Sequence, residues 1–177
     1  MSSDELNLFS YEILGLIGRE GAGPHDLRRM VDRGRIFDWA GESRYYVEPK
    51  RLAKLGYLEA RKEPGKTRER TVYSLNEKGL GALREFAATP ARFTPLKSEP
   101  LVRLLVADLV GEGPTRESVV ALRDELEEIE RRVDEAEASA AMLPHRRKYL
   151  EITIGFLRDY LRLHRELIER VERELEP

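Results

Sequence analysis

The sequence of 177 residues contains no cysteine, which excludes disulfide bonds, thiolate zinc sites and cysteine nucleophiles. Aromatic residues make up only 7% of the chain, and this scarcity argues against the large pocketed core of many enzymes. No apolar run approaches the roughly 18 residues of a membrane span. The first residues also lack the basic segment that opens a secretory signal peptide. We therefore expect a cytoplasmic protein that does not contact a membrane.

Charged residues are abundant, at 36% of the chain, although the formal net charge is only −2. An average globular domain has about a quarter of its residues charged, and an excess of both signs is typical of exposed helices and coiled coils. The near-neutral total conceals an asymmetry. Residues 1–95 carry 17 Lys/Arg and 14 Asp/Glu, a net of +3, whereas residues 96–177 carry 14 and 19, a net of −5.

Three prolines, Pro90, Pro95 and Pro100, divide the sequence. Proline stops helix continuation and biases the preceding residue away from helical conformation, so this stretch is predicted to be a stiffened linker. We predict a first domain at residues 1–88, the proline-rich linker at residues 89–100, and a helical dimerisation domain at residues 101–177.

The first part contains three short helical patterns. Ser10 is placed to cap the first helix, and Gly23-Pro24 opens a second that Gly34 ends. The third pattern covers about residues 43–55, with Gly56 well placed to terminate it.

The pattern then changes from helical to alternating. Residues 57–61 and 70–75 predict two strands joined by a turn at Pro64-Gly65-Lys66, and Asn76 is expected to cap a helix that ends near Ala88. Three helices, a hairpin and a further helix are the order of a winged helix-turn-helix, so the fold class we predict is mainly α with a small β hairpin. In that fold the second and third helices face DNA and the hairpin forms the wing.

Three stretches within this region, ILGLIGREGAGPHDLRRMV, RYYVEPKRLAKLGYLEARKE and RERTVYSLNEKG, resemble the PadR family of bacterial transcriptional regulators. The resemblance covers about residues 9–86. It implies a homodimeric DNA-binding regulator, often a repressor and sometimes released by a small molecule. Pro49 departs from the family, which more often has an aliphatic residue there. Either the third helix begins late, near Tyr46, with Pro49 in its first turn, or it is kinked at Pro49.

Local charge supports DNA binding independently of the resemblance. Residues 43–70 contain nine Lys/Arg and four Glu, a net of +5, in the third helix and the hairpin. Because phosphate neutralisation supplies much of DNA affinity, such a stripe is the expected footprint, although a solvated charged face is the alternative. The residues predicted to contact DNA are Ser43, Arg44, Tyr46, Lys50, Arg51, Lys54, Lys66, Arg68 and Arg70.

The helical part carries apolar residues at spacings of three and four, which predict long helices at residues 116–142 and 145–175 around Pro144. A short break makes two such helices antiparallel neighbours. The second helix has an additional apolar stripe, which we expect a second copy of the chain to cover, although the winged domain or a helix at residues 101–110 could also fold over it. The residues predicted for dimerisation are Ile154, Phe156, Leu157, Tyr160, Leu161, Leu163, Leu167 and Ile168.

Nothing in the sequence suggests catalysis. The three histidines, at positions 25, 145 and 164, lack partners at metal-ligand spacing, so no metal, cofactor or catalytic residue is predicted. Four aromatic residues could line an effector pocket or belong to an ordinary core: Phe37, Trp39, Phe156 and Tyr160.

We therefore predict a regulator, expected to be a repressor, that binds double-stranded DNA at a pseudo-palindromic operator as a homodimer, with a small-molecule effector as a further partner. The alternative is a protein-interaction adaptor built on a winged helix and a coiled-coil scaffold. The basic stripe discriminates between them, because an adaptor does not need it.

Overall fold

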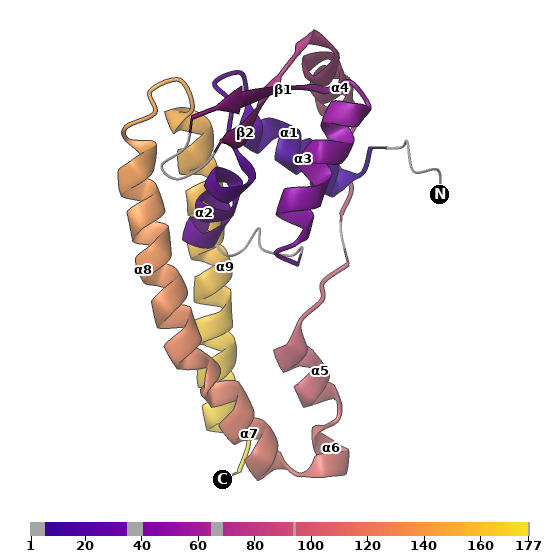
Figure 1. The fold of residues 1–177 in the computed structure, drawn as a ribbon. Helices are drawn as coiled ribbons and strands as arrows, with labels where there is room; N and C mark the ends of the chain where they lie inside the picture. Colours follow the sequence, from indigo (N-terminus) through magenta and orange to yellow (C-terminus); the bar gives the residue numbers. More distant parts are fainter. Residues whose placement is uncertain (1–5, 35–40, 65–68, 94, 177) are drawn as a thin grey trace. The chain divides into compact units, whose positions relative to one another are not determined.

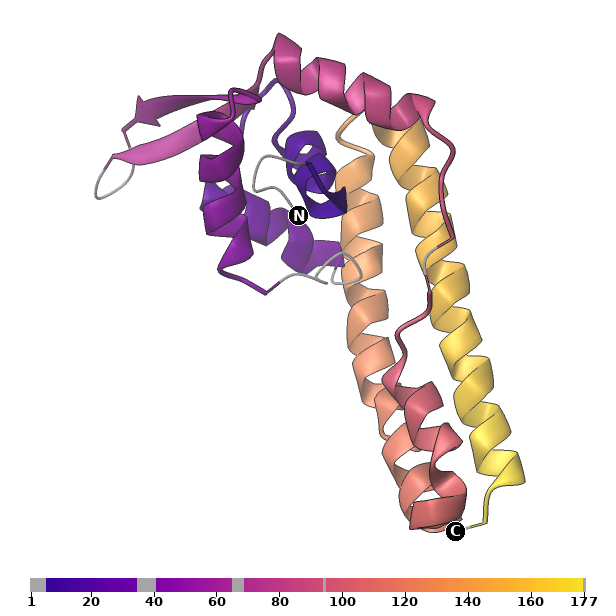
Figure 2. The ribbon, with the colours of Figure 1, turned by 90° about the vertical axis from the view of Figure 1, so that its right-hand side faces the viewer.

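The computed structural model describes residues 6–34, 41–64, 69–93 and 95–176. The chain forms two compact units that meet in the linker between Arg92 and Phe93. The domain boundaries that we place at residues 88 and 100 stay predictions. Each unit is described separately below (Figures 1 and 2).

The first unit contains the elements α1 (Leu8–Ile17), α2 (Pro24–Gly34), α3 (Arg44–Lys54), β1 (Leu58–Glu63), β2 (Arg70–Leu75) and α4 (Glu77–Ala88). The two strands are antiparallel, with Leu58 opposite Leu75 and Glu63 opposite Arg70. The hairpin projects from the helices (Figure 2). This confirms the predicted fold class, mainly α with a winged helix-turn-helix and one small hairpin.

Two asparagines cap helices in this unit. Asn7 accepts the backbone N–H of Ser10, and the Ser10 hydroxyl accepts the N–H of Asn7, so α1 begins with a capping box. The prediction that Ser10 is the cap was therefore wrong by three residues. Asn76 caps α4 as predicted and accepts the N–H of Gly79 at 2.9 Å.

The core of the first unit joins α1 to the elements that follow it. Its fully buried side chains include Phe9, Ile13, Leu27, Tyr45 and Leu52. β2 is also fastened to the turn between α1 and α2, because the backbones of Ala22 and Tyr73 exchange two hydrogen bonds. The helices and the hairpin therefore share one core.

Pro49 lies inside α3 and not in its first turn. The helix begins at Arg44 and continues through Pro49 to Lys54, so the prediction of a late start near Tyr46 was wrong. The Pro49 ring is buried, whereas Gly56 follows the helix with a positive φ of 80° and ends it as predicted.

The second unit contains α5 (Glu99–Leu105), α6 (Ala107–Val110), α7 (Glu112–Val120), α8 (Leu122–Ala140) and α9 (Arg147–Glu174). Two predicted helices are interrupted. The segment 101–110 divides at Val106, and the segment 116–142 divides at Ala121. Neither residue is a glycine or a proline, so neither the apolar spacing nor a helix-breaking residue marked these breaks in the sequence.

α8 and α9 lie side by side as antiparallel neighbours, as predicted (Figures 1 and 2). Arg123, near the start of α8, pairs with Glu172 near the end of α9 at 2.7 Å. Asp134, further along α8, pairs with Arg158 at 2.8 Å. The residues buried between the two helices follow the predicted apolar repeat: Leu126, Val133, Ala140, Ile154, Leu157, Leu161, Ile168 and Val171.

Candidate functional site

One side of α3 is exposed and basic. Its buried residues are Tyr45, Glu48, Pro49 and Leu52, which turn the rest of the helix outward. Apart from the neighbours Tyr46 and Val47, the exposed side chains of this helix face follow one another at spacings of three or four: Ser43, Tyr46, Val47, Lys50 and Lys54. Four of these five were predicted to contact DNA. The fifth, Val47, is 61% exposed and offers an apolar contact among them.

Arg44 is exposed, but its guanidinium group packs against α1. Its guanidinium carbon lies 4.5 Å from the centre of the Phe9 ring, which is a cation–π geometry. Phe9 in turn meets the Tyr45 ring edge to face at 5.1 Å. The first turn of α3 is therefore packed against the first turn of α1.

Arg51 is turned toward Glu48 and Ser10 and is only partly exposed, and its role in DNA contact stays a prediction. Its guanidinium donates two hydrogen bonds to the Glu48 carboxylate, at 2.7 and 3.0 Å, and one to the Ser10 hydroxyl at 3.0 Å. Only about a quarter of its side chain is exposed. In the sequence, Lys50 lies next to Arg51 and suggests a DNA contact, whereas Glu48, three residues before it, is the signal for the ion pair that the structure shows.

Glu48 is ionised inside the domain. Burial alone would raise the pKa of this carboxyl group. The hydrogen bonds from Arg51 and Ser10, together with the positive charges of Arg51 and Arg44, outweigh burial and hold the pKa of Glu48 below its ordinary value.

A groove separates the start of α2 from α3 and β2. Its lining includes His25, Tyr46, Lys50, Arg70 and Tyr73. Two cationic side chains, Lys50 and Arg70, therefore border the same hollow from different elements.

Arg70 ties the hairpin to α2. Its guanidinium pairs with Asp26 at 3.2 Å and with Glu63 at 3.4 Å, while half of the side chain remains exposed. The other predicted wing residues, Lys66 and Arg68, lie outside the described residues.

The residues predicted for dimerisation divide into two groups. Four are buried within one chain by the packing of α8 and α9: Ile154, Leu157, Leu161 and Ile168. They are therefore covered within one chain, and their role in dimerisation stays a prediction. The other four lie on a different stripe of α9, where Phe156 is 67% and Leu163 60% exposed, and Tyr160 and Leu167 are half-buried.

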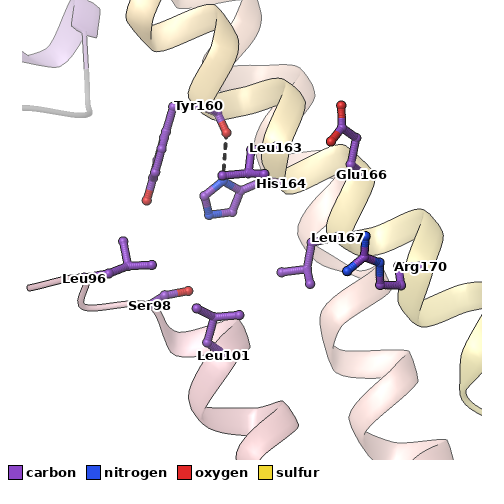
Figure 3. A pocket seen from close by; sticks show the side chains of 9 residues that line it. All are labelled: Leu96, Ser98, Leu101, Tyr160, Leu163, His164, Glu166, Leu167 and Arg170. Atoms are coloured by element: carbon purple, nitrogen blue, oxygen red, sulfur yellow. Dashed lines mark hydrogen bonds between the residues drawn. The ribbon is translucent and has the colours of Figure 1, made fainter.

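The second unit has a pocket of about 200 Å³ between α9 and the segment that leads into α5 (Figure 3). Its walls are mainly apolar, and its polar members are Ser98, Tyr160, His164, Glu166 and Arg170. The Nδ1 atom of His164 lies 2.9 Å from the Tyr160 carbonyl oxygen. Because a carbonyl oxygen can only accept a hydrogen bond, Nδ1–H is the donor and Nε2 is left for other partners. Of the four aromatic residues considered for a pocket, Tyr160 lines this one and Phe156 does not. Phe37 and Trp39 lie outside the described residues.

The described parts of the chain offer neither a metal centre nor a membrane-spanning helix. No group of three or more His, Asp or Glu side chains there could hold a metal ion. None of the described helices is long and apolar enough to cross a membrane.

No protein-family model matches this sequence, and no curated protein matches it. Solved structures do match. PadR of Bacillus subtilis in complex with operator DNA has a TM-score of 0.65 at 18% identity, over 93% of this chain and 99% of that one. The same protein with p-coumaric acid has a TM-score of 0.57 at 16% identity, over 94% and 99%.

Two further regulators match over similar lengths. A PadR-like transcriptional regulator of Bacillus cereus has a TM-score of 0.69 at 14% identity, over 97% of this chain and 99% of that one. The virulence activator AphA of Vibrio cholerae has a TM-score of 0.63 at 19% identity, over 93% and 94%. The resemblance indicated by the sequence is thus confirmed at the level of the fold, and this chain has the fold of the PadR and PadR-like transcriptional regulators.

Proposed function

We propose that this protein is a sequence-specific DNA-binding transcriptional regulator. The observation that carries the proposal is the exposed face of α3, where Tyr46, Lys50 and Lys54 lie on the outer side of the second helix of a helix-turn-helix. A helix in this position inserts into the major groove, where lysine donates to the O6 and N7 atoms of guanine. The structure of PadR with operator DNA supports the same use of the fold.

The groove beside α3 supports a phosphate contact. Lys50 and Arg70 border it, and His25 is exposed in the first turn of α2. Cations near a helix N-terminus favour an anion, so we assign this rim to the DNA backbone. Ser43 and Arg44, at the start of α3, complete the proposed contact surface.

Selection from a random DNA pool tests this proposal. The full chain is incubated with random duplexes, and bound DNA is amplified over several rounds. We expect one enriched sequence with two-fold symmetry and half-sites about one helical turn apart. Recovery of sequences no different from the input pool would contradict sequence-specific binding and favour the adaptor alternative.

We propose further that the protein acts as a homodimer through α9. Phe156 and Leu163 leave a large apolar area exposed on one stripe, beside half-buried Tyr160 and Leu167. A second copy of the same stripe would cover this area with a self-complementary interface.

Sedimentation velocity tests the dimer. We expect the wild-type chain to sediment at twice its formula mass and the double variant Phe156→Glu, Leu163→Glu to sediment as a monomer with unchanged helix content. Arg162→Glu, which lies outside the stripe, is the control and should remain dimeric. A wild-type monomer at micromolar concentration would rule the proposal out.

The pocket beside α9 is our proposed effector site (Figure 3). Its apolar walls suit an aromatic ring, and Arg170 with His164 can bind a carboxylate. PadR of B. subtilis has been solved with p-coumaric acid, which makes this acid a suitable probe. We expect it to raise the melting temperature of the wild type but not of Leu101→Trp, which fills the pocket from α5 and lies outside the apolar stripe of α9. Ile152→Trp, outside the lining, should respond as the wild type does.

We propose repression as the direction of control. A dimer that occupies an operator overlapping a promoter excludes polymerase, and ligand binding at the pocket of the second unit can release it. AphA, an activator with this fold, shows that the fold also serves the opposite direction. A reporter gene behind the selected sequence distinguishes the two: expression should fall when the protein is supplied, and a rise would identify an activator.

A further inference from the structure

α3 contains a proline at its sixth residue. Pro49 has no backbone N–H, so it cannot donate to the carbonyl oxygen of Tyr45, and its ring crowds that carbonyl group. A helix interrupted in this way usually bends or ends. α3 nevertheless continues from Arg44 to Lys54, and residues on both sides of Pro49 face outward in the proposed DNA surface.

Glu48 and Arg51 bridge the proline. They stand three residues apart, on either side of Pro49, and the Arg51 guanidinium donates to both oxygens of the Glu48 carboxylate at 2.7 and 3.0 Å. Such a forked pair fixes the relative orientation of its two groups in addition to attracting them. It therefore spans Pro49 and ties the residue before the proline to the turn that follows it.

Ser10 connects this pair to α1. Its hydroxyl donates to Glu48 Oε1 at 2.7 Å and accepts from Arg51 Nη2 at 3.0 Å and from the Asn7 N–H at 3.1 Å. One donor and two acceptor positions are the full capacity of a hydroxyl group. Ser10 is completely buried and Glu48 is 8% exposed, so the network is internal.

A polar network is an unusual way to hold a helix inside a core. Well-packed apolar side chains often stabilise such a site as well as an ion pair does. Hydrogen bonds differ because they are directional, and a small rotation or axial shift of α3 against α1 would break both contacts that join the two helices, Ser10–Glu48 and Arg51–Ser10. The network is therefore suited to fixing one orientation of α3.

We propose that Ser10, Glu48 and Arg51 form a splint across Pro49 that positions Tyr46, before the proline, relative to Lys50 and Lys54 after it. Glu48 is the central positioning residue, since it accepts hydrogen bonds from both of the others. The consequence for DNA rests on the proposed function. The effect of these three residues on the conformation of α3 does not depend on the proposed function.

The direction in which one substitution changes DNA affinity separates a positioning role of Glu48 from a purely electrostatic one. Glu48→Gln makes the first unit more positive by one charge, so phosphate attraction alone predicts tighter DNA binding. The splint predicts the opposite for the selected duplex, with affinity about tenfold lower because a charge-assisted contact is lost. Glu59→Gln is the control, because Glu59 is exposed on β1 and the charge change is the same. Binding of Glu48→Gln equal to or tighter than that of Glu59→Gln would overturn the positioning role.

A second measurement needs no DNA. Amide hydrogen exchange of the full chain should be accelerated in residues 50–54 by Glu48→Gln, and also by Ser10→Ala, which changes no charge. Pro49→Ala restores the missing N–H, so the acceleration caused by Glu48→Gln should shrink in that background. If Glu48→Gln accelerates exchange equally with Pro49 present and in the Pro49→Ala background, or if exchange in α3 does not change, the splint is refuted even if the protein binds DNA. If selection recovers no operator, the proposed function fails while this result still decides on the splint.

Discussion

Glu48 remains charged in the folded protein because its partners compensate for burial. Its pKa is held below its ordinary value, near 4.5, by Arg51, Ser10 and Arg44. A group with a depressed pKa in the folded state stabilises the fold fully above the ordinary pKa, and this contribution is lost as pH falls through the folded value.

This linkage predicts a pH-dependent difference between two proteins. The free energy of unfolding of the wild type should exceed that of Glu48→Gln by a constant amount near neutral pH. The difference should shrink below pH 4.5, because the unfolded carboxylate takes up a proton first. Urea titrations at several pH values measure it, with Glu59→Gln as the control. A difference that stays constant down to pH 3 would show that the charge of Glu48 does not contribute.

Single residues also show where prediction from the sequence ends. Lys50 and Lys54 were placed correctly, because a helical period fixes their common face. The direction of the Arg51 side chain was not predicted, because it depends on Ser10, 41 residues earlier in the chain. Pro49 was recognised as a departure, but local rules left open whether the helix begins late, near Tyr46, or is kinked at the proline.

Among the elements, α4 offers a matched test of close packing. Alanine is a better helix former than glycine, so Gly→Ala usually stabilises a helix. A Cβ at Gly79 would lie 2.7 Å from Leu75 Cδ1 and closer still to the Tyr57 carbonyl oxygen, whereas a Cβ at Gly81 meets nothing within 4 Å.

We therefore predict opposite signs for two substitutions in one helix. Gly81→Ala should stabilise the protein by about 0.5–1 kcal/mol. Gly79→Ala should destabilise it by about 1–3 kcal/mol because the strand-to-helix contact must open. Thermal unfolding compares them directly. The packing of α4 on the hairpin would be in doubt if both variants were stabilised.

α9 has two apolar stripes with different roles. Leu161 is 2% exposed between α8 and α9, and Leu163 is 60% exposed on the other stripe. Leu161→Ala should lower the free energy of unfolding by about 2–5 kcal/mol. Leu163→Ala should instead weaken the dimer and change stability only through protein concentration. Equal, concentration-independent losses in urea titrations would contradict this division.

The fold order and the antiparallel pairing of α8 and α9 followed from periodicity, proline positions and turn residues. The interruptions at Val106 and Ala121 did not, because both residues are compatible with a helix. α5, α6 and α7 pack against one another and α7 packs against α9, and local apolar spacing does not encode such contacts.

For the whole molecule, the distribution of charge matters more than its total. The net of −2 combines a first part of +3 with a second part of −5. Only the first part suits a polyanion, so DNA should bind there while the acidic helices remain in solvent. Affinity for a duplex of scrambled sequence should fall steeply as salt rises, by a slope of about 0.9 per phosphate contact on logarithmic axes. Fluorescence anisotropy at several salt concentrations measures this slope, and a flat response would indicate a partner other than nucleic acid.

The most direct test is an anisotropy titration of three proteins with the selected duplex. The wild type is compared with the double variant Lys50→Ala/Lys54→Ala and with the double variant Arg84→Ala/Arg92→Ala. The second double variant removes the same charge from exposed positions elsewhere in the first unit. We predict that the α3 double variant loses about a hundredfold or more in affinity, and that the control loses only the smaller amount due to charge. Equal losses in the two variants, or wild-type affinity in the α3 variant, would contradict the assignment of α3 as the DNA-reading helix.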